Sequence, residues 1–126
     1  MENQIKAVVE KYIAAIHSQN EEEFKSIWAE KEKCTLISLS SEFVGLDQIY
    51  NEFLINRIQA KFQSIDLVSD GMRVNQINDN LAVVVFRYHT ECNLRENGEP
   101  FGIQGLETQV IVKEDGVWKL CHVHYS

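Results

Sequence analysis

Apolar residues recur at three- and four-residue steps near the start of the chain, which predicts an amphipathic helix over about residues 3–17. The buried stripe of this helix comprises Ile5, Val8, Val9, Tyr12 and Ile16. Asn20 and the three glutamates after it predict the start of a second helix, because an Asn side chain caps free backbone N–H groups and acidic residues favour the first turn. Phe24, Ile27 and Trp28 form the apolar side of that short helix.

A strand and a third helix are predicted next. Residues 34–39 are rich in apolar and β-branched side chains and have strand propensity. Gly45 interrupts this run, and Asp47 is placed to cap the third helix. The apolar side of this helix carries Leu46, Ile49, Tyr50 and Phe53. All three predicted helices therefore precede residue 62.

From Phe62 onward polar and apolar residues alternate with a period of two, which predicts β-strands. The turns between them carry Asn78 to Asn80, Asn97-Gly98 and Asp115-Gly116, the last being a strong hairpin signal. The predicted strands cover about residues 62–77, 81–93, 101–114 and 117–125. Three helices followed by a mostly antiparallel meander predict a single α+β domain over residues 1–126.

The predicted strands are long enough that the sheet must twist and curl, so that one face wraps around the helices. Alternation places Val84 and Phe86 on one face of the second long strand and Val85 on the other, so both faces are partly apolar. One face is expected to pack on the helices. Because no further helix is predicted to cover the other, we expect a second subunit there, in a homodimer or a higher homo-oligomer.

Composition and charge exclude several classes of protein. With 44 % hydrophobic and 25 % charged residues, the chain has the balance of a globular protein. Its net charge of −7 gives no general attraction for phosphate backbones, so no nucleic-acid partner is expected. No apolar stretch approaches the length of a membrane span, and the first residues do not resemble a signal peptide. Three cysteines without CxxC spacing favour a reducing, cytoplasmic location.

Alternation also predicts which polar side chains share a face with apolar ones. On the last strand this set is Trp118, Leu120, His122 and His124. On the preceding strand it is Gly105, Glu107 and Gln109, and on the long strand it is Val85, Arg87, His89 and Glu91. Titratable groups are therefore expected on the face that encloses the helices, provided that no β-bulge shifts the register.

The last part of the chain resembles a known family. The stretch that carries the resemblance runs from Glu107-Thr108-Gln109-Val110 through Asp115-Gly116 and Trp118 to His122, His124 and Ser126. It looks like the closing hairpin of SnoaL-like proteins of the nuclear-transport-factor-2-like superfamily. The likeness is strongest to the association (hub) domain of calcium/calmodulin-dependent protein kinase II. Gly45-Leu46-Asp47, Phe86-Arg87 and Tyr12 match the same pattern in kind.

The resemblance implies a cone-shaped, curved sheet wrapped around three N-terminal helices, a cystatin-like α+β roll with an internal cavity. It also implies dimerisation through the outer sheet face. Proteins with this fold include isomerases, cyclases, dehydratases and non-catalytic ligand binders, so that the function must be argued from the site residues.

Arg87 has two interpretations. A buried guanidinium needs an anionic partner, which is either Glu107 on the adjacent strand or a bound anion. In the hub-domain family an arginine at the matching position lines a pocket that accepts small carboxylates. The other arginines of that pocket are replaced here by Gln109 and Tyr50.

His122 and His124 have three interpretations. Two imidazoles at i and i+2 can chelate a metal only with further ligands, for which His89 and Glu107 are candidates, and the resemblance supports no metal. They can also line the cavity as hydrogen-bonding groups, or be structural histidines. We predict that they line the cavity and that no metal or other cofactor is bound.

Tyr12 matches a tyrosine that donates to the substrate oxyanion in ketosteroid isomerases. That chemistry also needs a carboxylate base, and the stretch from Leu36 to Ser40, where the base is expected, contains no acid. This particular isomerase mechanism is therefore disfavoured.

These arguments predict a cavity for a small polar or anionic organic molecule. Its predicted lining is Tyr12, Arg87, Gln109, Trp118, His122 and His124. One alternative is an enzyme of the isomerase, cyclase or dehydratase kind, with His122 or His124 as the base and Tyr12 as the oxyanion donor. Another is a non-catalytic assembly module.

Overall fold

The computed structural model describes all residues from 1 to 126 and begins with two helices, α1 (Glu2–Ser18) and α2 (Glu21–Ser26). Both confirm the sequence-based predictions. The Asn20 side chain accepts a hydrogen bond of 2.9 Å from the backbone N–H of Glu23, which is the predicted cap. Phe24 and Trp28 are fully buried.

The third helix is a short α-helical turn, α3 (Leu46–Gln48), that continues as the π-helix η1 (Ile49–Gln59). Its cap is Gly45 and not Asp47, which lies in the first turn. Gly45 has a φ of 85°, and a Cβ atom there would lie 3.3 Å from the carbonyl oxygen of Glu32. Both the backbone conformation and the close approach therefore favour glycine as the residue that starts this helix.

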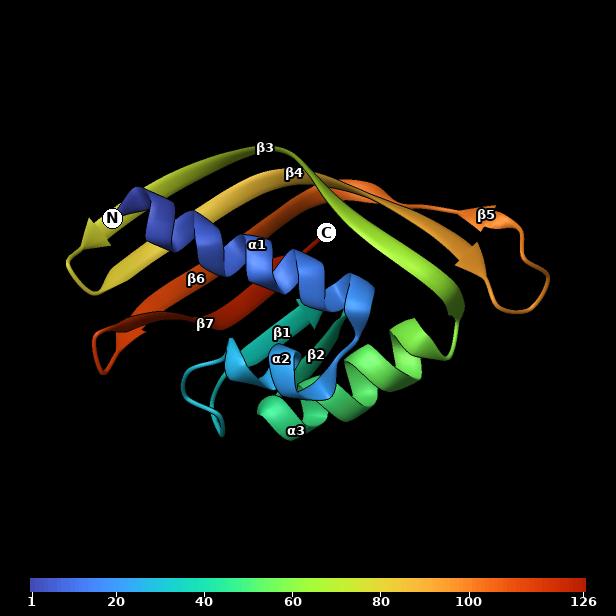
Figure 1. Cartoon of the computed structure of the whole chain (residues 1–126), viewed down its shortest axis with the longest axis horizontal. Helices are drawn as coiled ribbons and strands as arrows, with labels where there is room; N and C mark the ends of the chain where they lie inside the picture. The colour runs from blue at the N-terminus through green and yellow to red at the C-terminus, as the bar shows by residue number, and fades with distance from the viewer.

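Seven strands form one curved sheet in the order β2-β1-β7-β6-β4-β3, with β5 added on β4 (Figure 1). The long strands are β3 (Phe62–Asn78), β4 (Leu81–Leu94), β6 (Gln104–Glu114) and β7 (Val117–Tyr125), close to the predicted ranges. The short strands are β1 (Thr35–Ser38), β2 (Ser41–Val44) and β5 (Pro100–Phe101). All pairs are antiparallel except β1 with β7. Strand β2 was not predicted, because it has only one buried residue, Phe43, and this is too few to show an alternating pattern.

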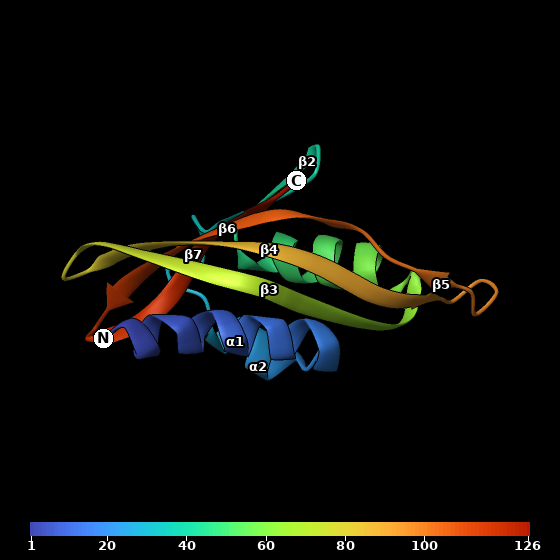
Figure 2. The ribbon, with the colours of Figure 1, turned by 90° about the horizontal axis from the view of Figure 1, so that it is seen from above.

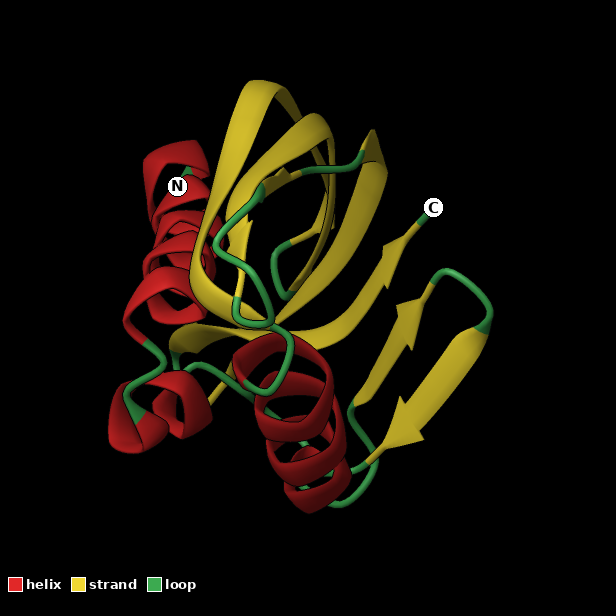
Figure 3. Ribbon diagram, turned by 90° about the vertical axis from the view of Figure 1, so that its right-hand side faces the viewer, coloured by secondary structure: helices red, strands yellow, loops and turns green.

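The long strands curl into a half-barrel, with α1 along its open side and η1 beneath its lower end (Figures 2 and 3). A register shift in β3 between Ser69 and Met72 places two residues, Asp70 and Gly71, opposite the single residue Arg87 of β4 and supports the bend. The core lies between this sheet and the helices, where 29 buried hydrophobic residues form one cluster. This is the α+β roll that the sequence predicted. No helix has the length and hydrophobicity needed to cross a membrane.

A β-bulge in β7 changes which residues face the core. Ile111 pairs with Leu120, whereas the preceding residue, Val110, pairs with His122, so Cys121 is the extra residue. Before the bulge Trp118 and Leu120 point inward, and after it Val123 and Tyr125 do. His122 and His124 therefore point outward, and the prediction that they share a face with Trp118 is wrong, because one extra residue reverses the alternation.

Candidate functional site

A cavity of about 190 Å³ lies between the inner face of the sheet, α1 and η1. Of its sixteen lining residues, eight are aliphatic or phenylalanine residues and eight carry a polar side-chain group. Three of them are exposed, Leu39, Arg57 and Lys61, and we call this exposed part the mouth of the cavity. The polar lining residues are Tyr12, Ser38, Arg57, Lys61, Tyr88, Thr90, Glu107 and Tyr125.

Glu107 is the buried charged group of the cavity. It lies in the middle of β6, and only 2 % of its surface is exposed. Its carboxylate accepts a hydrogen bond of 2.7 Å from Nε2 of Gln109 and has no basic side chain within ion-pair distance. Burial raises the pKa of Glu107 to about 7, and the Gln109 hydrogen bond only partly opposes this. Near neutral pH the carboxyl group therefore exists in both protonation states.

Three tyrosines surround Glu107. Tyr125 on β7 is its direct partner in the sheet register, and Tyr88 reaches the same place from β4. Tyr12 comes from α1 and is 1 % exposed. Burial raises the pKa of all three hydroxyls, and the negative charge of Glu107 raises each further. They are therefore protonated hydrogen-bond donors at neutral pH.

Two of these tyrosines are held by further contacts. The Tyr125 hydroxyl and the Ser38 hydroxyl form a hydrogen bond, and the Tyr88 hydroxyl donates to the backbone oxygen of Ser126 at 3.2 Å. Gly105 allows the second contact, since a Cβ atom there would overlap the Ser126 oxygen and crowd the Tyr88 ring. Side-chain and backbone contacts thus keep both rings at the cavity wall.

The predicted site residues are only partly brought together. Tyr12 lines the cavity as predicted. Gln109 lies behind the cavity wall, fully buried, and orients Glu107. Trp118 faces the core but lies outside the lining of the cavity.

Arg87 is exposed on the outer face of β4, because it pairs with Leu106 while its neighbour Phe86 pairs with Glu107. An Arg87–Glu107 ion pair is therefore excluded by the opposite directions of the two side chains, and the expected buried guanidinium is absent. The inference failed because the apolar run around Arg87 reflects two partly apolar faces and not a buried strand.

The two C-terminal histidines also lie outside. Nδ1 of His122 is 2.5 Å from the Thr35 hydroxyl, and partial burial lowers the pKa of His122. His124 is exposed, with its ring 6.4 Å from that of His122. Neither lies in the cavity, so neither is placed to act as its base. No three His, Cys, Asp or Glu side chains are arranged to hold a metal ion.

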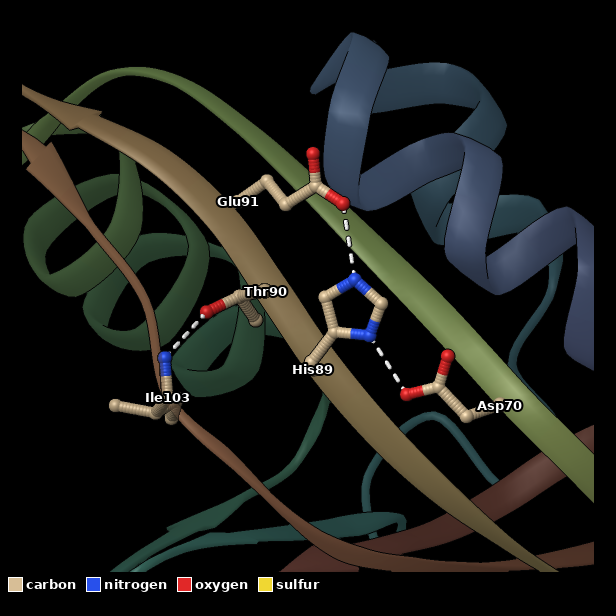
Figure 4. Close-up of polar contacts among 5 residues, drawn as sticks. All are labelled: Asp70, His89, Thr90, Glu91 and Ile103. Carbon is tan, nitrogen blue, oxygen red and sulfur yellow. Dashed lines mark hydrogen bonds and ion pairs between the residues drawn. The ribbon is translucent and has the colours of Figure 1, made fainter.

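His89 lies on the outer face too, where both ring nitrogens meet carboxylates (Figure 4). Nδ1 is 2.6 Å from Asp70, in the irregular part of β3, and Nε2 is 2.9 Å from Glu91. These two hydrogen bonds raise the pKa of His89. The next residue, Thr90, points the opposite way, and its hydroxyl accepts a hydrogen bond from the backbone of Ile103 (Figure 4).

Sequence reasoning misses three lining groups that matter chemically. It places Glu107 on the correct face but treats it only as a partner of Arg87 or of a metal. It assigns Tyr88 and Tyr125 to faces but not to a site. The signal for Glu107 in the sequence is a carboxylate in an apolar strand, two residues before a glutamine on the same face.

The whole chain matches a known family. Residues 5–126 match the family model of the SnoaL-like domain. The chain belongs to the SnoaL-like family. This confirms the resemblance on which the expected fold was based. No curated protein sequence matches the chain significantly.

Solved structures share this fold over nearly the whole chain, and one of them is a member of the nuclear-transport-factor-2-like superfamily. A superfamily member from Salmonella enterica subsp. enterica serovar Typhimurium str. LT2 has a TM-score of 0.92 and 25 % identity, covering 98 % of this chain and 88 % of its own. The hexachlorocyclohexane dehydrochlorinase LinA-type3 from Novosphingobium barchaimii LL02 has a TM-score of 0.86 and 14 % identity, covering 99 % and 84 %. A protein described as a calcium/calmodulin-dependent protein kinase II association domain, from Xanthomonas campestris, has a TM-score of 0.80 and 23 % identity, covering 97 % and 84 %.

Proposed function

We propose that this SnoaL-like domain binds a small, mainly apolar organic molecule and that Glu107 transfers a proton to or from it. The observation that carries the proposal is a carboxyl group that is 2 % exposed, lines a cavity, lacks a cationic partner and has a pKa of about 7. A general acid or base works best when its pKa lies near the working pH. Strongly perturbed groups in a cavity are also the usual sign of a functional site.

The surrounding hydroxyls suit a reaction that develops negative charge on an oxygen. Ionised Glu107 can remove a proton from carbon, while Tyr12 donates a hydrogen bond to the developing oxyanion. Isomerisation and elimination both begin with removal of a proton from carbon. Dehydrochlorination, the elimination for which the structurally similar dehydrochlorinase is named, belongs to the same class of chemistry. The catalytic base in this proposal is a carboxylate on β6, in place of the histidines expected from the sequence.

The test uses 5-nitrobenzisoxazole, a small apolar substrate for any base in an apolar cavity. The base removes the ring C–H proton, the N–O bond breaks, and a coloured cyanophenolate forms. We expect a rate that rises with pH through about 7, as Glu107 ionises. Glu107→Gln should lower it by about 100-fold. The control Glu10→Gln removes an exposed carboxylate of α1 and should change nothing. A Glu107→Gln protein that folds and keeps the rate would refute the proposal.

A second proposal concerns assembly as a homodimer through the outer face of the sheet. The apolar side chains that remain partly exposed there are Val83, Val85, Leu106, Val110 and Val112. Leu106 alone keeps 44 % of its surface exposed. Analytical ultracentrifugation should give a dimer for the wild type and a monomer for Val85→Glu. A monomeric wild type would refute the proposed homodimer.

The cytoplasmic location remains an expectation from cysteine chemistry. Cys34, Cys92 and Cys121 are all free thiols, and burial raises the pKa of each. Protonated thiols are poor nucleophiles, so neither the buried Cys34 and Cys92 nor the partly buried Cys121 is a candidate catalytic group.

A further inference from the structure

Two cations stand at the mouth of the cavity. Arg57 is near the end of η1, and Lys61 lies in the turn between η1 and β3. Both side chains are exposed and both line the cavity. Burial raises the pKa of Tyr125, and the charge of Arg57 slightly opposes this rise, so that charge acts on a group inside the cavity. The ionised groups of the cavity are thus two cations at the mouth and one buried carboxyl group.

Neutral groups, and not carboxylates, hold these cations in place. Nη2 of Arg57 donates to the Ser41 hydroxyl at 3.1 Å, and its guanidinium lies 5.3 Å from the ring centre of Phe43. Nζ of Lys61 lies 4.5 Å from the ring centre of Phe101 and 5.4 Å from that of Phe62. Neither cation takes part in an ion pair. Both charges are therefore positioned but uncompensated, in a chain of net charge −7.

The size of the cavity limits what can reach past these cations. An apolar cavity of about 150 Å³ accommodates a benzene ring, and this cavity measures about 190 Å³. It therefore has room for one ring with a short substituent. Two uncompensated cations at the entrance favour an anionic group at the outer end of such a molecule, since charge-assisted hydrogen bonds are the stronger ones.

We infer that the ligand is an amphipathic anion, with a single-ring apolar body in the cavity and an acidic group held by Arg57 and Lys61 at the mouth. This inference rests on the proposed function, because it names the class of molecule on which Glu107 acts. It also assigns anion binding to Arg57 and Lys61, and not to Arg87.

The test compares three probes with one body and different head groups: 3-phenylpropanoate, 3-phenylpropan-1-ol and 3-phenylpropylammonium. Calorimetric titration of the wild type should show the carboxylate binding about tenfold more tightly than the alcohol. High salt should weaken binding of the carboxylate and leave the alcohol unaffected. In Arg57→Gln/Lys61→Gln the carboxylate should lose its advantage, while the alcohol binds as before.

The matched control is Lys11→Gln/Arg73→Gln, which removes the same charge from exposed positions outside the cavity. It should bind all three probes like the wild type. The inference is overturned if the control loses as much affinity as the mouth variant, if the alcohol binds as tightly as the carboxylate, or if the carboxylate does not bind. Tightest binding of the ammonium probe would also overturn it, since Glu107 would then be the partner of a cationic ligand.

The two proposals fail in different ways. Glu107→Gln should keep the preference for the carboxylate probe but lose proton transfer from 5-nitrobenzisoxazole. A wild type that shows no preference for the carboxylate probe therefore counts against the mouth alone, and retained catalysis in Glu107→Gln counts against the acid–base role alone.

Discussion

Carboxyl groups occur in two opposite environments on the two faces of this sheet. On the inner face, Glu107 is buried with one hydrogen-bond donor and no cation. On the outer face, Asp70 and Glu91 share the imidazole of His89 at 2.6 and 2.9 Å. Ionised carboxylates only accept hydrogen bonds, so the contacts at both nitrogens of His89 favour the protonated imidazolium form of the ring. The outer-face carboxylates are compensated by His89, whereas Glu107 on the inner face has no cationic partner and is available to a ligand or a reaction.

Both environments raise a pKa, but for opposite reasons. Desolvation raises the pKa of Glu107 to about 7, because burial penalises its charged form. Two hydrogen bonds to anions raise the pKa of His89, because they favour its charged form. Ionisation of the buried Glu107 destabilises the folded state as pH rises. Protonated His89, by contrast, stabilises the folded state through its two hydrogen bonds. The direction of a shift therefore does not distinguish a functional site from a structural contact, while its cause does.

The largest effect is expected from Glu107→Gln on stability. The folded-state pKa of about 7 lies above the value of an unfolded glutamate, so wild-type stability falls as pH rises from about 4.5 to about 7. The variant cannot ionise and escapes this loss. Chemical denaturation should show that the free energy of unfolding of Glu107→Gln, relative to the wild type, increases over this range, by about 3 kcal/mol at pH 8.

The control is again Glu10→Gln, for which the difference from the wild type should not change in this window. If the stability of Glu107→Gln relative to the wild type is the same at pH 5 and pH 8, Glu107 is ionised and compensated in the folded protein. The contrast between the two faces would then disappear.

A smaller effect is expected from Gln109→Leu. Nε2 of Gln109 is the hydrogen-bond donor that partly stabilises the ionised form of Glu107. Without it the pKa of Glu107 should rise above its wild-type value. If the bond contributes about 1.4 kcal/mol, the ratio of ionised to neutral Glu107 falls roughly tenfold. NMR titration of ¹³C-labelled glutamate carboxyls measures this directly.

The effect of Gln109→Leu on stability should be modest, because Oε1 of Gln109 is buried without a partner and its removal offsets part of the loss. The control is Thr108→Val, on the same strand but facing outward. It should leave the pKa of Glu107 unchanged. An unchanged pKa in Gln109→Leu would mean that burial alone sets the protonation of Glu107.

The fold was largely predictable from the sequence, because it depends on repeated patterns. The stripe on α1, the Asn20 cap and the alternation in β3, β4 and β6 each rest on several residues that agree. The site depends on single residues instead. Cys121, one extra residue in β7, turned His122 and His124 outward. No local sequence feature marks that bulge, because it depends on how β7 pairs with β6.

The convergence on Glu107 was not predictable for a related reason. Tyr12 comes from α1, Tyr88 from β4 and Tyr125 from β7, and they meet only in the curled sheet. Arg57 reaches the same cavity from η1, whose π-helical spacing differs from that of an α-helix, and Lys61 reaches it from the turn after η1. Alternation could assign Glu107 to the inner face, but it could not show that no cation lies beside it.

The smallest effect is expected from His89→Gln, because the His89 site is exposed to solvent and surface ion pairs contribute little. A folded-state pKa raised above the unfolded value means that the contact stabilises fully below about pH 6.5 and is lost as pH rises through the folded-state pKa. His89→Gln should therefore be less stable than the wild type at pH 6 and equal to it at pH 9. Since His89 joins β4 to the irregular part of β3, hydrogen exchange of the β3 amides near Asp70 should also be faster in the variant at pH 6. A deficit that persists at pH 9 would show that His89 acts by packing and not by its charge, and the outer face would no longer be the compensated counterpart of Glu107.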